Sequence, residues 1–330
     1  MTGETEDGVV DTSRTGQFLR DHGVELTVVF GVVVLIALTI ASDAEAVAAA
    51  LRSFDWWALV VVIALTTGGF AFRYLKWEFY LRHLDIRVPP VRSVLVFVSG
   101  LMMVLTPAKG GGVWKGWLLN ESDDVQISRI VSVVIAERAT DLLALCALAS
   151  LGIALSGRSA VVVGAVVGVF LAIIGLVQWR SFCLRVLDLV RAIPLLGRFA
   201  DSLETAYQDS YALFQLRPLA ISLSLSLAAW TTEGMSLWVV LRGLGDEPDP
   251  FTALSVFGTG SVVGGASMLP GGFGAAEASI AGLLVALGYD SGTAASATII
   301  VRIGTLWYGA AFGTLGYTVY KLRRRVNDSD

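Results

Sequence analysis

Residues 268–284 read MLPGGFGAAEASIAGLL, and they interrupt an apolar stretch, 251–288, with one proline and a group of glycines. A second apolar stretch, 93–120, is broken in the same way by LTPAKGGGVWKGWLL at residues 105–119. Proline and glycine end one helix and allow another to begin. The sequence therefore predicts two helix–break–helix hairpins, with the break residues Pro107, Gly110, Gly111, Pro270, Gly271, Gly272 and Gly274.

The whole chain is far more apolar than a soluble domain. Of its 330 residues, 55% are hydrophobic and 16% are charged, against about 25% charged in soluble domains. Mean hydropathy is +0.70, and a helix needs about 20 residues to cross the hydrocarbon layer. We therefore expect an all-α polytopic membrane protein with two re-entrant hairpins and about six full spans, near 24–41, 56–75, 128–155, 159–179, 218–241 and 292–321.

The distribution of arginine and lysine predicts the orientation, because cytoplasmic loops carry the excess of these residues. Three segments are basic, namely 73–92, 180–217 and the C-terminal end with Lys321, Arg323, Arg324 and Arg325. All three lie on one side if both hairpins return to their side of entry, which places both termini in the cytoplasm. We expect a cytoplasmic polar tail at 1–23, a single transmembrane domain at 24–321 and a second tail at 322–330.

The basic segment 180–217 has apolar residues at helical spacing in two runs, separated by Pro194 and Gly197. One interpretation is a pair of amphipathic helices on the inner membrane face, where arginines meet anionic head groups. The other is a short cytosolic helical pair that packs on the ends of the spans.

The two broken stretches form the core of an internal repeat. Pro107 is followed after eight residues by Lys115, and Pro270 after seven by Glu277. Arg138 lies 31 residues after Pro107, and Arg302 lies 32 residues after Pro270. Three predicted spans separate the hairpins, so the second would enter from the opposite face. Inverted repeats with broken helices are typical of secondary transporters; the alternative is that proline and glycine only mark tight connections between short helices.

Several predicted spans carry charged side chains near their middle. Glu137, Arg138 and Asp141 share one flank of the span 128–155, while Glu233 and Arg302 lie deep in later spans. Such residues must face the interior of the bundle, either paired or hydrated. One hypothesis is a polar cavity in which Arg138 and Arg302 bind a phosphate, with Lys109, Lys115 and Glu277 at the hairpin tips. The other is a buried pair of Arg138 with Asp141 or Glu137 that locks the bundle.

Catalytic and cofactor-binding patterns are missing from the sequence. Both histidines, His22 and His83, lie outside the predicted spans, and there is no HExxH motif, P-loop or paired metal-ligand spacing. We expect no catalytic residues, no cofactor and no metal. The net charge of -4 argues against nucleic acid as a partner.

With these motifs in view, the chain resembles the flippase-like transmembrane family related to the membrane region of lysylphosphatidylglycerol synthases. The resemblance is carried by PAKGG at 107–111, ERATD at 137–141, LPGGFG at 269–274 with Glu277, and Arg302. Gly112 stands where the family usually has an acidic residue, whereas Lys115 matches the basic residue that follows. Bifunctional relatives add a soluble aminoacyltransferase domain that these 330 residues do not contain.

The resemblance implies translocation of a lipid head group across the cell membrane. The cargo would be a phospholipid or a polyprenyl-linked head group that carries a phosphate. Its expected ligands in the cavity are Arg138, Arg302, Lys109, Lys115, Glu277, Glu137, Asp141 and Glu233. The rival hypothesis is a non-transporting scaffold, or a partner subunit, for a separately encoded lipid-modifying aminoacyltransferase or glycosyltransferase.

Overall fold

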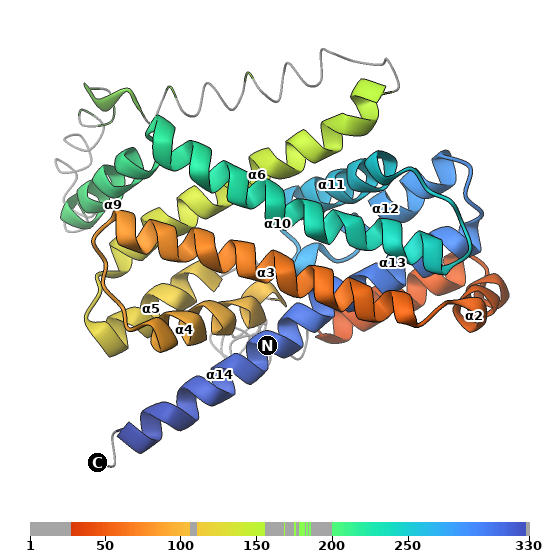
Figure 1. Ribbon diagram of the computed structural model, residues 1–330, viewed down its shortest axis with the longest axis horizontal. Coiled ribbons are helices and arrows are strands. Elements are labelled where there is room, and N and C mark those ends of the chain that lie inside the picture. Colours follow the sequence, from red (N-terminus) through yellow and green to blue (C-terminus); the bar gives the residue numbers. More distant parts are fainter. Residues whose placement is uncertain are drawn as a thin grey trace, which may run out of the picture.

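The computed structural model describes residues 28–105, 111–155 and 200–327, and a few isolated positions between 168 and 185. All the regular structure in these residues is helical, which confirms the predicted class (Figure 1). A first helix, Val28–Ala41, precedes α2 (Ala44–Ser53), α3 (Trp57–His83), α4 (Pro90–Met102), η1 (Met103–Leu105), α5 (Gly111–Asp123), α6 (Ile127–Leu155), α9 (Ala200–Leu213), α10 (Leu216–Gly243), α11 (Pro250–Ala266), η4 (Pro270–Gly272), α12 (Ala275–Ala286), α13 (Ser291–Arg302), η5 (Ile303–Trp307) and α14 (Tyr308–Asn327).

Two of the described helices are long and apolar enough to cross a membrane. They are α3 and the continuous helix Ser291–Arg325, which joins α13, η5 and α14. Two bent pairs bring the number to four if each pair is one span: Val28–Ala41 with α2, bent by 103°, and Asp201–Leu213 with α10, bent by 78°. The protein is therefore a polytopic membrane protein. The predicted span near 159–179 lies outside the described residues.

The boundary predicted after residue 75 is wrong. Helix α3 continues to His83, because Trp77, Tyr80 and Leu81 remain fully buried along its length and proline first occurs at Pro89. Arg73 and Lys76 belong to the predicted basic segment 73–92, and they consequently lie inside the helical bundle.

Both Pro/Gly-broken stretches fold as antiparallel helical hairpins. In the first, Gly100 on α4 packs against Lys115 on α5. In the second, Gly264 of α11 approaches Ala276 of α12, and Gly260 approaches Ile280. Of the first break, Gly111 begins α5, while Pro107, Lys109 and Gly110 lie outside the described residues.

Glycine is required in the second break by the backbone itself. Pro270 begins the short 3-10 helix η4, and Gly271, Gly272 and Gly274 follow with positive φ of 60°, 68° and 82°. A side chain in this left-handed region is strained. At Gly272 a Cβ atom would also lie 3.0 Å from the backbone of Gly264, so this glycine lets the two arms of the hairpin approach.

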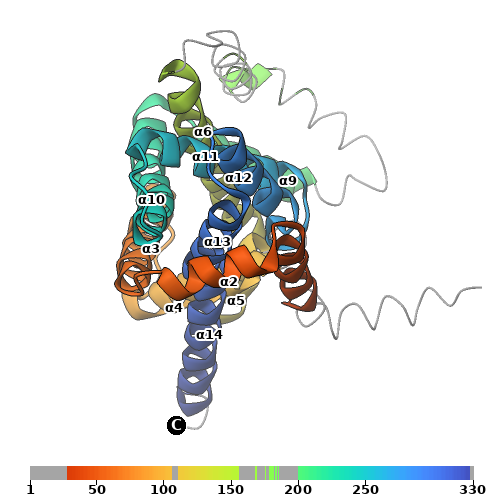
Figure 2. The same cartoon turned by 90° about the vertical axis from the view of Figure 1, so that its right-hand side faces the viewer.

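The hairpins come from opposite ends of the molecule, and their tips meet. Helices α4 and α5 occupy the left half of Figure 1, and α11 and α12 occupy the right half. The tip of the first hairpin, η1, contacts the tip of the second, η4. Viewed from the end, α13 lies near the centre, beside the α3–α10 pair (Figure 2), and it packs against both α10 and α2.

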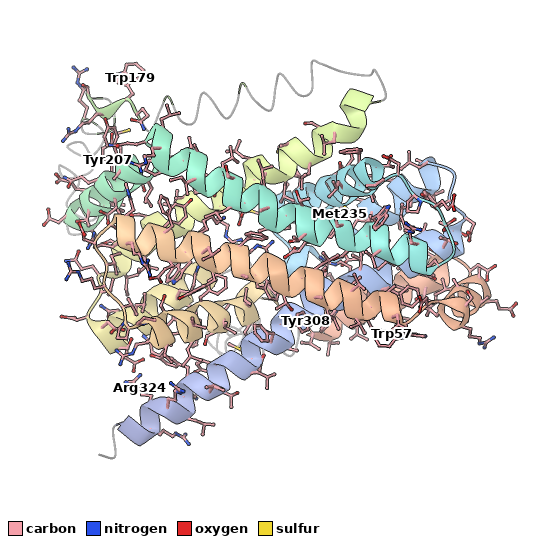
Figure 3. The ribbon with its side chains drawn as sticks, in the orientation of Figure 1. Trp57, Trp179, Tyr207, Met235, Tyr308 and Arg324 are labelled. Carbon is pink, nitrogen blue, oxygen red and sulfur yellow. The ribbon has the colours of Figure 1, made fainter. Side chains whose placement is uncertain are left out.

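The two ends of the bundle differ in charge. At one end, ion pairs join Arg92 to Asp123, Arg129 to Asp209 and Arg324 to Glu121; Arg324 and Tyr207 mark this end in Figure 3, and Trp57 lies toward the other. The opposite end is acidic, with Asp43, Asp246, Glu247, Asp249 and Asp290 in its connections. Three of these aspartates (Asp43, Asp249 and Asp290) cap the helices that begin there, α2, α11 and α13.

The segment 180–217 is described mainly in its second half, as α9. This helix packs on the beginning of α6, where Arg129 Nε bonds Asp209 Oδ2 at 3.0 Å and Ser132 Oγ donates to Ala206 O at 3.0 Å. Helix α9 therefore packs on α6, and the position of the segment 180–217 relative to the membrane stays a prediction.

Candidate functional site

A charged cavity of about 180 Å³ lies between the two hairpins. Its wall is partly apolar, with Phe70, Phe97, Trp230, Phe257 and Leu306. Its charged lining comes from α3, α5, α6, α10 and α13, and consists of Arg73, Lys76, Lys115, Glu137, Arg138, Asp141, Glu233 and Arg302. The sequence predicted that six of these side chains gather in one place: Lys115, Glu137, Arg138, Asp141, Glu233 and Arg302.

We call each hairpin together with the helix that follows it a hairpin unit: α4, α5 and α6 form the first, and α11, α12 and α13 form the second. Each unit has one ion pair in the equivalent place, with the positions of the acidic and the basic residue exchanged. In the first unit Lys115, on the returning arm α5, bonds Glu137 on α6 at 2.8 Å (Nζ to Oε2). In the second unit Glu277, on the returning arm α12, bonds Arg302 on α13 at 2.5 Å (Oε1 to Nε). In both units, the returning arm is thus tied to the next helix by one buried salt bridge.

The second of these pairs also fixes the break in its hairpin. Glu277 Oε2 accepts a hydrogen bond from the amide of Gly274 at 2.7 Å, and Arg302 Nη2 donates to Gly271 O at 2.6 Å. Glu277 is 1% exposed and is not among the residues that line the cavity. It therefore acts on the cavity through Arg302, whose Nη1 has no hydrogen-bond partner among the described residues.

A third ion pair lies at the junction of α3, α6 and α10. Lys76 Nζ donates to Asp141 Oδ1 at 2.6 Å and to Ser226 Oγ at 2.7 Å, and Ser226 Oγ donates to Asp141 Oδ1 at 3.1 Å. The predicted pairing of Arg138 with Asp141 or Glu137 is wrong, because Lys76 and Lys115 reach these carboxylates from neighbouring helices.

The fourth pair contains Arg73, which, like Lys76 of the third pair, was not predicted as a site residue. Arg73 Nη1 bonds Glu233 Oε1 at 2.5 Å, and its guanidinium lies 4.3 Å from the ring centroid of Trp230. Its Nη2 atom is buried without a hydrogen-bond partner. The available signal was that Arg73 precedes Lys76 by three residues, which places both on one helical face.

Arg138 differs from every other cation of the cavity. It lines the cavity and is exposed, and no ion pair or hydrogen bond joins its side chain to another described residue. The four pairs neutralise Arg73, Lys76, Lys115 and Arg302. With all these groups ionised, the described part of the cavity carries one uncompensated positive charge, that of Arg138. Lys109 lies outside the described residues.

Helix α13 is irregular directly after Arg302. The next five residues, η5, form a π-helical turn, and Thr66 Oγ1 of α3 donates to the carbonyl of Gly304 at 3.0 Å. Such turns occur frequently at functional sites. Here the turn follows the arginine of the second hairpin unit, and Thr305 and Leu306 of the turn line the cavity.

This arrangement can bind an anion, since an unpaired guanidinium forms strong bidentate hydrogen bonds with phosphate and carboxylate oxygens. Among the described residues, no set of three or more His, Cys, Asp or Glu could hold a metal ion. Whether the predicted residues bind a substrate stays a prediction.

Comparison with known proteins shows which family the chain is similar to. The family model described as the lysylphosphatidylglycerol synthase TM region matches residues 25–313. Two UPF0104 membrane proteins of Methanothermobacter thermautotrophicus are 26% and 24% identical; each alignment covers 88% of this chain, and 91% and 94% of the relatives. A UPF0104 membrane protein of Methanocaldococcus jannaschii is 21% identical, over 65% of this chain and 92% of its own length. The chain belongs to the family of the lysylphosphatidylglycerol synthase transmembrane region.

Proposed function

We propose that this protein translocates a phosphate-bearing lipid head group, of a phospholipid or a polyprenyl-linked lipid, across the cell membrane. The observation that carries the proposal is Arg138, the unpaired cation among the described residues of a cavity whose other described charges are paired. A charge at this depth is costly unless it is neutralised or hydrated. The phosphate would occupy the cavity beside Arg138 and the free Nη1 of Arg302, while the acyl or polyprenyl tails stay in the lipid.

The arrangement of the hairpins supports movement across the membrane. They are rooted at opposite ends of the bundle, and their tips meet beside the cavity. We infer an inverted repeat with two re-entrant hairpins and about six full spans, the pattern in which secondary transporters hold a site near the midplane. The exchanged pairs Lys115–Glu137 and Glu277–Arg302 support this repeat.

The charge difference between the ends supports an orientation. Cytoplasmic loops of membrane proteins are enriched in Arg and Lys, and Arg92, Arg129 and Arg324 lie at the end opposite the acidic connections. Helix α14 ends there, and we place both termini in the cytoplasm. Movement would be driven by a lipid gradient or an ion, without a cofactor and without chemistry on the lipid.

Reconstitution into liposomes tests this function. Purified full-length protein is inserted into vesicles with head-group-labelled phospholipid, and the labelled lipid that becomes accessible to a membrane-impermeant quencher is followed over time. The wild type is expected to move lipid, Arg138→Gln to lose most of this activity, and Arg217→Gln to retain it. Arg217 is a matched control, because it is exposed at the start of α10, away from the cavity lining.

A folded protein that moves no lipid under any imposed gradient would contradict this proposal. That result would favour a scaffold or partner subunit for a separately encoded lipid-modifying enzyme. Equal activity of Arg138→Gln and Arg217→Gln would show that transport does not use the cavity.

A further inference from the structure

The π-helical turn after Arg302 lies where one continuous helix passes from the second hairpin unit to the surface of the first. Before the turn, α13 packs on α12, the returning arm of the second hairpin, and on α2 and α10. After the turn, α14 packs along α4 of the first hairpin and reaches its tip, η1. The long helix runs from α13 in the right half of Figure 1 to α14 at the lower left. Relative movement of the two units has to be absorbed between these packed flanks.

Both flanks of the turn are held by close contacts between helices. A Cβ atom added at Gly292 of α13 would lie 2.7 Å from the Cβ of Ala46 on α2, and one added at Gly313 of α14 would meet the backbone of Met102 on α4. Such close packing leaves the flanks little freedom to slide or rotate. The π turn differs, because its hydrogen bonds span one residue more than those of an α-helix, and this extra residue can be taken up or released.

A hydrogen bond from a neighbouring helix supports the π turn. The Tyr308 amide donates to the carbonyl of Ile303, five residues earlier, whereas in an α-helix it would donate to that of Gly304. Thr66 Oγ1 of α3 donates to Gly304 O at 3.0 Å and shares its hydrogen with Val62 O at 2.9 Å. Thr66 is fully buried, and a Cβ atom at Gly304 would meet the Val62 side chain. The hydroxyl therefore takes the place of the α-helical donor.

We propose that residues 303–307 are a hinge between the two hairpin units, and that Thr66 is the positioning residue that holds this hinge in its π-helical state. In this state Arg302 bonds Glu277 and the carbonyl of Gly271 in the second hairpin. If the Tyr308 amide bonds Gly304 instead, the turn becomes α-helical, and its flanks rotate against each other by about 100° and separate by about 1.5 Å. A fraction of this movement takes Arg302 out of hydrogen-bond reach and releases the hairpin. The inference goes beyond the proposed function, because it concerns how the units move and depends on no ligand.

Hydrogen–deuterium exchange of the full-length protein in micelles tests the positioning role. Thr66→Val removes the hydroxyl and keeps the shape, so we expect the amides of 271–278 to exchange about tenfold faster while those of α6 stay unchanged, because Arg302 no longer holds the break. Thr66→Ser keeps the donor and should behave as the wild type. Thr298→Val is the matched control, since Thr298 is fully buried on α13 and its hydroxyl bonds Ala294 O of the same helix. Unchanged exchange in Thr66→Val, or equal acceleration in Thr298→Val, would overturn this role.

A double-mutant cycle tests whether Thr66 acts through Arg302. Thr66 bonds Gly304, and Glu277 bonds Arg302. If the hydroxyl had only a local role, the effects of Thr66→Val and Glu277→Gln on the unfolding equilibrium constant would multiply independently. We expect the double variant to unfold about tenfold less readily than that product, because both changes remove the same restraint on the hairpin. Independent effects would refute the link.

Deletion of Ile303 tests the hinge without a Thr66 variant. A π turn resembles an α-helix with one inserted residue, so the deletion should give a regular helix whose flanks keep their faces. This variant should fold, protect 271–278 as the wild type does, and lose at least tenfold of the lipid movement in liposomes. Deletion of Ala311, in the regular part of α14, rotates one flank and should prevent folding. Lipid movement at the wild-type rate after deletion of Ile303, or equal failure of both deletions to fold, would refute the hinge.

These results are distinguishable from failure of the proposed function. Faster exchange of 271–278 in Thr66→Val, in a protein whose wild type moves no lipid, would support the hinge and refute translocation. Equal transport by the wild type and the Ile303 deletion would support translocation and refute the hinge.

Discussion

Breaking the Glu277–Arg302 pair should destabilise the protein unequally, depending on which partner is removed. In Arg302→Gln, the Glu277 carboxylate stays 1% exposed and loses its counter-ion, and the hydrogen bond to Gly271 O is lost. Removing one partner of a buried ion pair costs about 3–5 kcal/mol. In Glu277→Gln, the remaining guanidinium has a side chain that is 12% exposed and can turn toward the cavity, so we expect about 2 kcal/mol.

A double-mutant cycle measures the pair itself. Because both single variants leave an unpaired charge and the double variant leaves none, the double variant should cost about 1–3 kcal/mol less than the sum of the singles. Unfolding of the purified protein in micelles, followed by tryptophan fluorescence, gives the free energies. The exposed pair Arg324–Glu121, with side chains 40% and 33% exposed, is the control and should cost below about 1 kcal/mol. Additive single effects, or an Arg302→Gln cost equal to the control, would refute this reasoning.

Three further perturbations act on separate features. Gly272→Ala should lower the free energy of unfolding by more than Gly274→Ala, measured in the same fluorescence assay. Both variants add about 1–2 kcal/mol of positive-φ strain, but only the new Cβ at position 272 would also meet the Gly264 backbone, at 3.0 Å. Equal effects would contradict the close approach of the hairpin arms. Lys76→Met should cost about 3–5 kcal/mol by leaving Asp141 unpaired, and a thermal shift no larger than that of Arg217→Gln would be evidence against the buried network. Hydrogen bonds from Thr293 lower the pKa of Asp290. The contribution of this cap to stability, about 1 kcal/mol, is therefore present above the unfolded-state pKa of Asp290 and is lost as the pH falls. The difference in free energy of unfolding between wild type and Asp290→Ala should shrink from pH 7 to pH 3, and a constant difference would contradict the assignment.

Sequence periodicity and punctuation predicted the helical class and both hairpins, since apolar runs and Pro/Gly breaks are local signals. They also identified most of the cavity charges, because an ionisable residue within a span must face the bundle interior. The pairing of those charges could not be predicted. Asp141 is three residues from Arg138 on the same helix, yet it bonds Lys76 of α3 at 2.6 Å, a choice fixed only when α3 and α6 pack.

The misplaced end of α3 explains the two missed site residues, Arg73 and Lys76. A basic cluster near a span end reads as a loop, so the sequence placed Arg73 and Lys76 outside the membrane. Buried aromatic residues on α3 continue beyond them to Tyr80 and Leu81, and two acidic residues on other helices compensate the charges. Whether a cation belongs to a loop or to a buried pair depends on its partner, which is distant in sequence.

A role in stability alone does not account for this cavity. Buried ion pairs are often no more stabilising than well-packed apolar residues of similar volume. Selection for stability alone would therefore not favour four ion pairs around one cavity. Pairing also explains only the cations that form a salt bridge. Arg138 lines the cavity without an ion pair or a hydrogen bond to another described residue, and Arg73 keeps a buried N–H group without an acceptor. Both shortages, of one negative charge and of an acceptor oxygen, would be met by the anionic phosphate of the lipid that we propose as the ligand. On this proposal, the ligand completes the electrostatic balance of the cavity.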